Sequence, residues 1–367
     1  MLLTFPQMGH VEQLIGDILQ RLDIDYMPPP RTTAKTLALG TKHAPEFSCL
    51  PLKLNIGNFI EAMEAGADTL LMAGGRGPCR FGYYAELEER VLRDAGYDFT
   101  MVTIEPPTLG IAKFVRPIKR VSGKSTRQIW RALKEGFPKA RGFDMLEKRV
   151  LETRCYELKL GDTTRAHKEA MAILSRAKAP AEIEGAIEAG MRLIDGVACD
   201  RDQPVLKIGI VGEFFILLEP FVNFDIEEWL GNRGVLVSRS VYITDWIGPS
   251  TKNPVTGTSD AELTELARPY LGHFVGGEGL PSVAHTILYA NEGFDGVVHM
   301  FPFTCMPDTI AKAIIPRVSR DSDIPVIHFT IDEQTGKAGV ATRLEAFVDL
   351  LASRRRAKAK GAACKVS

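Results

Sequence analysis

Short apolar runs alternate with segments of helical periodicity twice along this sequence, and that alternation limits the folds open to the chain. In the first part, the runs MLLTF, IDYM, TLLMA and FTMVTI are separated by helix-like segments at residues 11–22, 52–65 and 83–95. After residue 204 the pattern returns with the runs VLKIGIV, GVLVSRSVYI, GVVHMF and PVIHFTI. Strands that alternate with helices form parallel sheets covered on both faces. The sequence therefore predicts an α/β protein with two three-layer α/β/α units.

The segment between the two units has a different character. It has few strand signals and many helix-forming residues, so we expect it to be mainly helical. From Ala112 to Glu169 it holds 16 lysine and arginine residues against 7 aspartate and glutamate residues. Such an excess is typical of a solvated helical surface or, alternatively, of a patch for an acidic partner or ligand phosphates. We therefore expect a first α/β unit at residues 1–111, a helical segment at 112–203 and a second α/β unit at 204–355. A basic tail at residues 356–367 is expected to be disordered.

The composition excludes several classes of protein. The 367 residues carry a formal net charge of −1, which argues against broad nucleic-acid binding. No apolar run reaches the ~18 residues of a membrane span. The first residues, MLLTFPQMGHVEQLIG, lack the basic region and cleavage site of a secretory signal, which favours the cytoplasm. The stretch SGKST at residues 122–126 is not a phosphate-binding loop, because Ile118 stands where that motif requires glycine.

Six cysteines in a reducing compartment are more consistent with buried thiols, metal ligands or catalytic thiols than with disulfides. Three of them, Cys49, Cys79 and Cys305, each stand just before an expected helix, and the last two also follow expected strands. Open parallel sheets bind ligands at the carboxyl ends of their strands. A helix N-terminus also offers free N–H groups and partial positive charge, which we expect to lower a thiol pKa and to suit an anionic cluster.

A weak internal repeat links two of these cysteines. The run EAGADTLLMAGGRGPC at residues 64–79 resembles NEGFDGVVHMFPFTC at residues 291–305. Each has a helix end with glycine, an aspartate, a buried strand and a short turn before the cysteine. Spacing alone leaves two other interpretations open, because scattered cysteines are commonly buried apolar residues and a zinc site could include one of the histidines.

Longer stretches of the chain resemble a known family. The run EFSCLPLKLNIGNFIEAMEAGADTLLMAGGRGPCRFGYYAEL resembles the Fe–S-binding segment of the 2-hydroxyacyl-CoA dehydratase D-component superfamily, which includes benzoyl-CoA reductase subunits and double-cubane-cluster proteins. The resemblance continues in VGEFFILLEPFVNFDIEEWLGNRGV, in VGGEGLPSVAHTILYANEGFDGVVHMFPFTCMPDTIAKAI and in DEQTGKAGVATRLEAFVDLL, and it is greatest to an activase-related branch. It implies two flavodoxin-like α/β units with a helical portion.

The resemblance also implies a cofactor. It places the thiolate ligands of a [4Fe–4S] cluster at Cys49, Cys79 and Cys305. A double-cubane cluster would need about six thiolates, so one cubane per chain is the expectation. Three thiolates leave one iron open to a small ligand, as in catalytic metal sites.

Other residues are candidates for the surroundings of that cluster. Arg76 and Arg80, beside Cys79, would offset its charge or bind a carboxylate or thioester oxygen. Glu278 stands where relatives are expected to have histidine, and a carboxylate there would tune or ligate the metal. Weaker candidates for contacts in the ligand crevice are Glu46 and Glu213.

The implied activity involves a second protein. Members of the family receive low-potential electrons from an ATP-hydrolysing Fe–S activase of the actin-like ATPase class, and a second dehydratase-like subunit or a homodimer is also implied. The expected function is the reduction or dehydration of a small substrate, for which an acyl-CoA is one candidate. A non-enzymatic Fe–S carrier or scaffold is an alternative, and so is a zinc-binding or metal-free α/β module.

Overall fold

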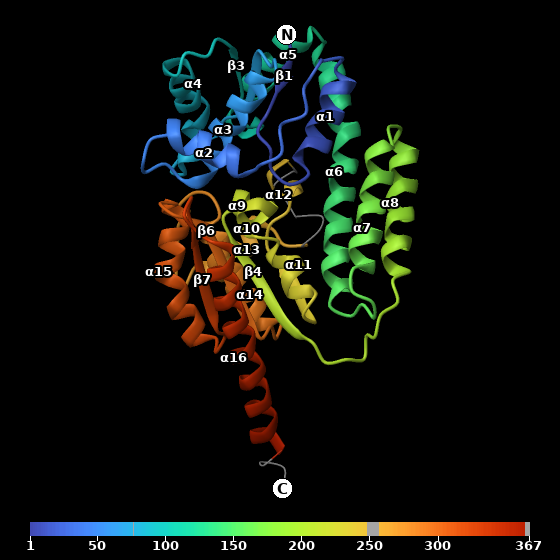
Figure 1. Ribbon diagram of the computed structural model, residues 1–367, viewed down its shortest axis with the longest axis vertical. Coiled ribbons are helices and arrows are strands. Elements are labelled where there is room, and N and C mark those ends of the chain that lie inside the picture. Colours follow the sequence, from blue (N-terminus) through green and yellow to red (C-terminus); the bar gives the residue numbers. More distant parts are fainter. Residues whose placement is uncertain (76, 248–256, 364–367) are drawn as a thin grey trace.

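The computed structural model describes residues 1–75, 77–247 and 257–363, which form a mixed α/β protein with two parallel sheets (Figure 1). The α/β class predicted from the sequence is confirmed. The first sheet has the order β1-β2-β3, with β1 (Leu3–Thr4), β2 (Thr69–Ala73) and β3 (Thr100–Ile104). The second has the order β5-β4-β6-β7, with β4 (Leu206–Gly212), β5 (Val235–Arg239), β6 (Gly296–Pro302) and β7 (Val326–Ile331).

Helices cover both faces of the first sheet. Neighbouring residues of a strand point to opposite faces, and β2 shows this clearly. Leu71 joins a core that includes residues of α1 and α5, whereas Leu70 and Met72 join a core with α3 and α4. The helices of this unit are α1 (Val11–Arg21), α2 (Ala34–His43), α3 (Leu50–Glu64), α4 (Tyr84–Asp94) and α5 (Ile111–Ser122), with short 3₁₀ turns η1 (Arg80–Tyr83) and η2 (Pro107–Leu109).

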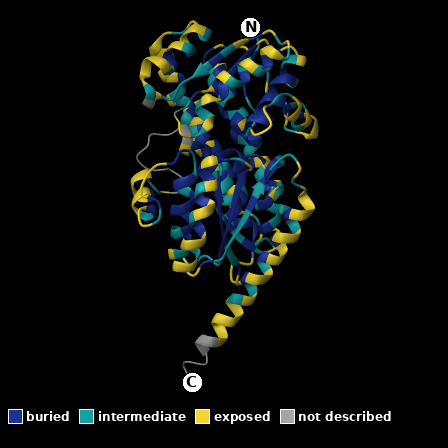
Figure 2. Cartoon of the chain, turned by 90° about the vertical axis from the view of Figure 1, so that its left-hand side faces the viewer, coloured by how far each residue is buried: buried dark blue, intermediate teal, exposed yellow. Residues whose placement is uncertain are grey.

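The second sheet is covered in the same way, and its strands are mostly buried (Figure 2). The backbone of Gly209 lies against the ring of Tyr289 in α14, and that of Gly296 lies against Leu351 and Phe347 in α16. These two glycines occupy opposite faces, because Gly296 pairs with the residue before Gly209. The helices are α9 (Phe214–Leu218), α10 (Pro220–Asn223), α11 (Ile226–Gly231), α12 (Ile243–Ile247), α13 (Asp260–Ala267), α14 (Gly279–Asn291), α15 (Met306–Asp321) and α16 (Lys337–Ala363).

Three helices, α6 (Thr126–Arg154), α7 (Asp162–Arg176) and α8 (Pro180–Asp195), stand beside both units (Figure 1). They have a core of their own around Phe143, Leu146 and Leu174. The N-terminal half of α6 belongs to a larger core that runs from the first sheet to the second. The two units and α6 are therefore held together by continuous apolar packing.

The two units repeat one arrangement. Asp68, just before β2, accepts a hydrogen bond from the backbone N–H of Leu2 at 2.7 Å, and Asp295, just before β6, accepts one from Lys207 at 2.8 Å. A bridge between Leu3 and Tyr26 extends the first sheet beyond β1. If the chain at Tyr26 is counted as a strand and the strands of each unit are numbered along the chain, both sheets have the order 2-1-3-4 of doubly wound folds. The flavodoxin-like assignment itself stays a prediction.

The C-terminal helix differs from the expectation. Residues 356–363 were expected to be disordered, but α16 continues to Ala363 and extends away from the body of the protein (Figure 1). Alanine, lysine and arginine are strong helix formers, and Arg354 and Lys358 both pair with Asp323. Among the described residues, no helix combines the length and the apolar composition that a membrane crossing requires.

Candidate functional site

The three candidate cysteines occupy equivalent positions at helix starts. Cys49 is the N-cap of α3, Cys79 that of η1 and Cys305 that of α15, and all three have extended backbone conformations. The second and third follow β2 and β6, which are corresponding strands of the two units. The local placement expected from the sequence is thus observed.

A single arginine joins the turns that carry these cysteines. Arg80, next to Cys79, donates to the backbone oxygen of Phe47 at 3.0 Å and to both the backbone oxygen and Oγ1 of Thr304, the latter at 3.0 Å. Thr304 Oγ1 donates in turn to the same oxygen of Phe47 at 3.1 Å. Phe47 lies two residues before Cys49, and Thr304 directly precedes Cys305. Three turns that are far apart in the sequence therefore meet at one guanidinium group.

A glycine turn from the second unit lies against the same place. A Cβ atom on Gly276 would lie 2.7 Å from the backbone nitrogen of Cys79, and one on Gly277 would lie 3.7 Å from its Sγ and 3.6 Å from Pro307. Both glycines have positive φ, which a side chain would strain. The next residue, Glu278, is the N-cap of α14, and in the described part of the chain its carboxylate has no hydrogen bond or ion pair. Glu278 therefore holds in the second unit the position that Cys49 holds in the first.

Two polar side chains next to the thiols were not identified from the sequence. The hydroxyl of Tyr84 lies 2.5 Å from Sγ of Cys49. The thiol of Cys305 donates to Oδ2 of Asp308 at 3.2 Å, and Oδ1 of that carboxylate lies 3.1 Å from Nε2 of His299. Tyr84 and Asp308 follow cysteines closely in the runs CRFGYY and CMPD, which is the signal that could have indicated them.

Cys49 and Cys305 are buried and Cys79 is half-buried, and the loss of hydration dominates the acidity of all three thiols. It raises the pKa of Cys49 and of Cys305, and it raises the pKa of Cys79 to about 11. The expectation that helix starts would lower these values is therefore wrong, because the loss of hydration outweighs the backbone N–H groups. The charge of Arg80 acts in the opposite direction on Cys49, whereas the carboxylate of Glu213 raises the pKa of all three thiols.

Carboxyl groups near the thiols also have raised pKa values. Burial raises the pKa of Glu213 to about 7, and it raises that of Glu278 well above its ordinary value, with Asp245 and Asp308 adding to the second shift. Glu213 accepts a hydrogen bond from the backbone of Ile216 at 3.0 Å, so it also caps α9. The region therefore holds thiols and carboxyl groups with little positive charge to stabilise their ionised forms.

A pocket of about 350 Å³ lies beside Cys49 and is lined by Glu46, Arg80, Tyr83 and Tyr84, among others. Glu46 thus lies near one of the cysteines, as expected for a residue of the ligand crevice. Arg76, which the sequence suggested for the same surroundings, lies outside the described residues.

The spacing of donor atoms bears on the kind of metal site. Within the described residues, three donors from histidine, cysteine or carboxylate side chains come within 4.8 Å of one another at only one place, His10, Asp144 and Glu147. Sulfur ligands of one tetrahedral zinc ion lie roughly 3.8 Å apart, because Zn–S bonds are about 2.3 Å long. The three thiols are therefore not arranged around a single zinc ion.

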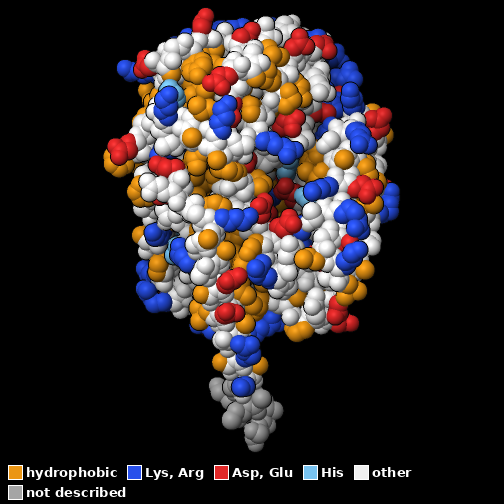
Figure 3. Space-filling model, in the orientation of Figure 1, with side chains coloured by type: hydrophobic (Ala, Val, Ile, Leu, Met, Phe, Trp, Pro, Cys, Tyr) orange, Lys and Arg blue, Asp and Glu red, His pale blue; other side chains and the backbone are white. Residues whose placement is uncertain are grey.

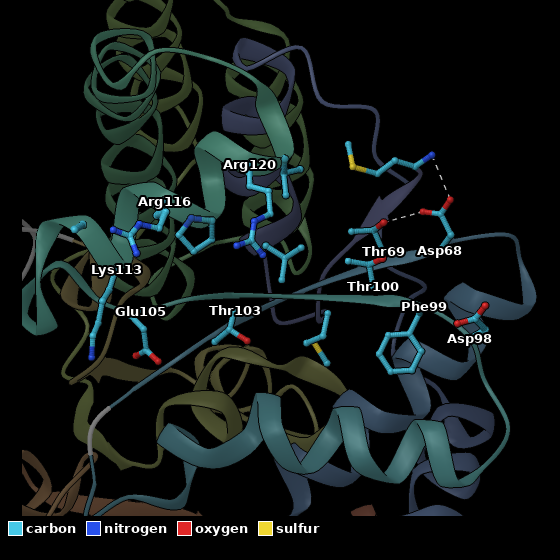
Figure 4. Close-up of a pocket in the computed structure, with 16 residues that line it drawn as sticks. Asp68, Thr69, Asp98, Phe99, Thr100, Thr103, Glu105, Lys113, Arg116 and Arg120 are labelled. Atoms are coloured by element: carbon cyan, nitrogen blue, oxygen red, sulfur yellow. Dashed lines mark hydrogen bonds and ion pairs between the residues drawn. The ribbon is translucent and has the colours of Figure 1, made fainter.

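The basic segment forms part of a second pocket. This pocket, of about 760 Å³, follows the outer edge of β3, and Lys113, Arg116 and Arg120 of α5 line it (Figure 4). For these three side chains, no ion pair is found in the described part of the chain. Other basic residues of the segment are paired, for example Lys124 with Asp23 at 2.5 Å. Part of the unpaired positive charge of this segment therefore lies along α5.

Compared with protein-family models the chain matches none, and no curated protein is significantly similar to it. The fold and the site define a parallel α/β protein of two units whose cysteine turns converge. The resemblance to the dehydratase superfamily remains a prediction and bears only on the proposal below.

Proposed function

We propose that this protein binds one [4Fe–4S] cluster through Cys49, Cys79 and Cys305. In this proposal, the protein accepts low-potential electrons from an ATP-dependent activase in the cytoplasm. It uses them for the reduction or dehydration of a small substrate, with an acyl-CoA as one candidate. The convergence of the cysteine-bearing turns on Arg80 supports the proposal, because it joins turns from distant parts of the chain.

The residues present fit such a cluster. All three side chains are thiols, and the neighbouring glycine turn carries no Cβ atom that would fill the space next to Cys79. Because the thiol pKa values are raised, the thiolates need a nearby positive charge to be stable. A positively charged metal core would supply that charge. A cubane bound by three thiolates supplies an iron with an open position for a substrate oxygen, together with one-electron chemistry.

The side chains around the thiols have distinct tasks in this proposal. Arg80 holds the turns in register through backbone oxygens, and its charge favours the thiolate of Cys49. The hydroxyl of Tyr84 hydrogen-bonds with the same sulfur. The pocket between Glu46, Tyr83 and Arg80 offers a substrate space next to Cys49.

Anaerobic purification with iron and sulfide analysis tests the cluster. We expect about 4 iron and about 4 sulfide per chain, and a large loss of both in Cys49→Ala, Cys79→Ala and Cys305→Ala. Cys199→Ala is the matched control, because the thiol of Cys199 donates to the backbone oxygen of Thr153 in the helical segment, away from the cysteine turns. Full iron content in all three single variants would refute the proposal, and zinc in place of iron would favour the zinc-binding alternative.

A second measurement separates an enzyme from an electron carrier. The loaded protein is mixed with an activase, ATP and a reductant, and candidate substrates are added. Reduction of the protein without turnover of any substrate would favour the carrier or scaffold.

A further inference from the structure

A second polar junction lies where the first unit, α6 and the second unit meet. His10 is the N-cap of α1, and Asp144 and Glu147 lie one turn apart on α6. The exposed fraction is 6% for His10, 0% for Asp144 and 21% for Glu147. The junction is thus buried, with one member that reaches solvent.

Each ring nitrogen of His10 faces a different carboxylate. Nδ1 lies 2.9 Å from Oε1 of Glu147 and is hydrogen-bonded to it. Nε2 lies 3.3 Å from Oδ1 of Asp144, and both atoms are buried, yet neither has a hydrogen-bond partner among the residues that the structure describes. The other oxygen of Asp144 accepts the backbone N–H of Thr244 at 2.8 Å. One nitrogen and one oxygen are therefore fixed in place within 3.3 Å of each other without satisfying each other by a hydrogen bond.

The surrounding charges leave a negative excess. Arg239 pairs with Glu147 and with both oxygens of Glu227, the latter at 3.2 Å. Asp144, Glu147 and Glu227 carry three negative charges and Arg239 carries one positive charge. One divalent cation would neutralise these four groups.

We propose that Nε2 of His10 and Oδ1 of Asp144 bind a divalent transition-metal ion, with Glu147 as the residue that positions the imidazole. A histidine that binds a metal commonly donates its other N–H to a carboxylate, which is the arrangement of His10 and Glu147. With bonds of about 2.1 Å, a nitrogen–oxygen separation of 3.3 Å gives an angle of roughly 100° at the metal, close to the tetrahedral and octahedral values.

The donor set and the surface indicate the class of ion. Imidazole with carboxylate suits zinc, manganese, iron and cobalt better than magnesium or calcium, which prefer oxygen ligands alone. Two protein ligands require water or a small ligand to complete the coordination. Figure 3 shows a recess between the two units, beside α6, where acidic, basic and histidine side chains gather. This recess would let water or a small anion reach the ion.

The competing explanation is a proton in place of the metal. A doubly protonated imidazole would also satisfy both carboxylates, and the junction would then be purely structural. Cobalt(II) is a suitable probe, because nitrogen and oxygen ligands give visible bands without the sulfur-to-metal charge transfer that bound thiolates would produce. The chain with Cys49, Cys79 and Cys305 changed to alanine removes the thiols from the assay.

We expect one cobalt(II) ion per chain in both proteins, in addition to any thiolate-bound metal in the unchanged chain. His10→Asn and Asp144→Asn should abolish the visible cobalt bands of the chain without the three thiols. Glu147→Gln should weaken cobalt affinity about 10- to 100-fold. His273→Asn, at an exposed histidine, is the matched control. Absence of cobalt binding by the thiol-free chain overturns the proposal, and so does binding that His10→Asn leaves unchanged. If His10→Asn does not fold, two measurements still test the proposal. They are the number of cobalt ions bound by the folded thiol-free chain and the cobalt affinity of Glu147→Gln.

Discussion

Two polar junctions connect the units of this protein, and the pKa values of their carboxyl groups Glu213 and Glu147 shift in opposite directions. The cysteine junction comprises the three cysteine turns with Glu213, and the histidine junction comprises His10, Asp144, Glu147 and Arg239. Burial raises the pKa of Glu213 to about 7. Burial alone would also raise the pKa of Glu147, but the charges of His10 and Arg239 outweigh it and hold that pKa well below its usual range.

The difference lies in what each arginine binds. Arg80 donates to backbone oxygens of the cysteine turns, and within the described ranges it pairs with no carboxylate. Arg239 pairs directly with Glu147 and Glu227 inside the protein. The carboxylates of the histidine junction are therefore partly balanced by a buried arginine, whereas the ionised forms of the cysteine junction would need a further positive group.

The largest effect is expected when the cysteine turns are separated without removal of a thiol. Arg80→Lys keeps the positive charge, but a lysine cannot donate to the oxygens of Phe47 and Thr304 with the geometry of a guanidinium group. We expect the variant to lose most of its iron after anaerobic purification. Arg93→Lys, in a pair with Glu89 on α4, should keep it. Equal iron content in Arg80→Lys and the unchanged chain would show that the turns do not depend on this tie.

The histidine junction should instead respond in stability. Arg239→Met leaves Glu147 and Glu227 buried without their cation, and breaking a buried pair in this way costs about 3–5 kcal/mol of the free energy of unfolding. Urea denaturation of the cluster-free protein measures this. Arg192→Met, in an exposed pair with Glu188, should change stability by less than about 0.5 kcal/mol. Comparable losses of stability in the two variants would show that the buried pairs of Arg239 contribute no more than an exposed ion pair.

Much of the fold followed from local sequence patterns. The alternation of apolar runs with helical segments predicts parallel sheets because it depends on neighbouring residues alone. The cysteines were placed at helix starts for the same reason. The helical tail differs from the expectation because the helix propensity of alanine, lysine and arginine and the pairing with Asp323 outweigh the effect of its charged composition.

The parts that could not be predicted depend on distant residues. The role expected for Arg80, to offset the charge of a cluster or bind a substrate oxygen, stays a prediction, whereas its bonds to backbone oxygens of distant turns could not be read from the sequence. His10 and Asp144 are far apart in the sequence and belong to no spacing motif, so only the packing of α1 against α6 brings them together. The thiol pKa values were misjudged because burial depends on the same tertiary packing.

The two junctions should lose stability in different pH ranges. Glu213 has a pKa of about 7 when folded, against an ordinary 4.5, so the folded state retains a proton that the unfolded state loses, and stability falls from pH 4.5 to 7. For His10, burial lowers the pKa, but Glu147 and Asp144 outweigh burial and raise it from 6.5 to about 9. Its contribution is complete below pH 6.5 and is lost as the pH rises through 9.

The pH dependence of stability in each range should be lost in one variant. Glu213→Gln should flatten the lower range and His10→Asn the upper one, each by about 1–3 kcal/mol in urea denaturation of metal-free protein with a chelator present. The unchanged range in each variant serves as the internal control. If either variant flattened both ranges, the two junctions would be coupled rather than independent.

The smallest effect is expected on the surface of α5, away from both junctions. Arg116 and Arg120 line the pocket along β3, and an activase that docks there would be steered by their charges (Figure 4). Changing both to glutamate should slow activase-dependent reduction a few-fold at low salt and leave the iron content unchanged. Because the Debye length falls from about 10 Å at 0.1 M salt to about 3 Å at 1 M, the difference should shrink at high salt. The same charge change at Arg165 and Lys168 on α7 is the control, and equal rates in the two double variants would identify α5 as an ordinary solvated helix.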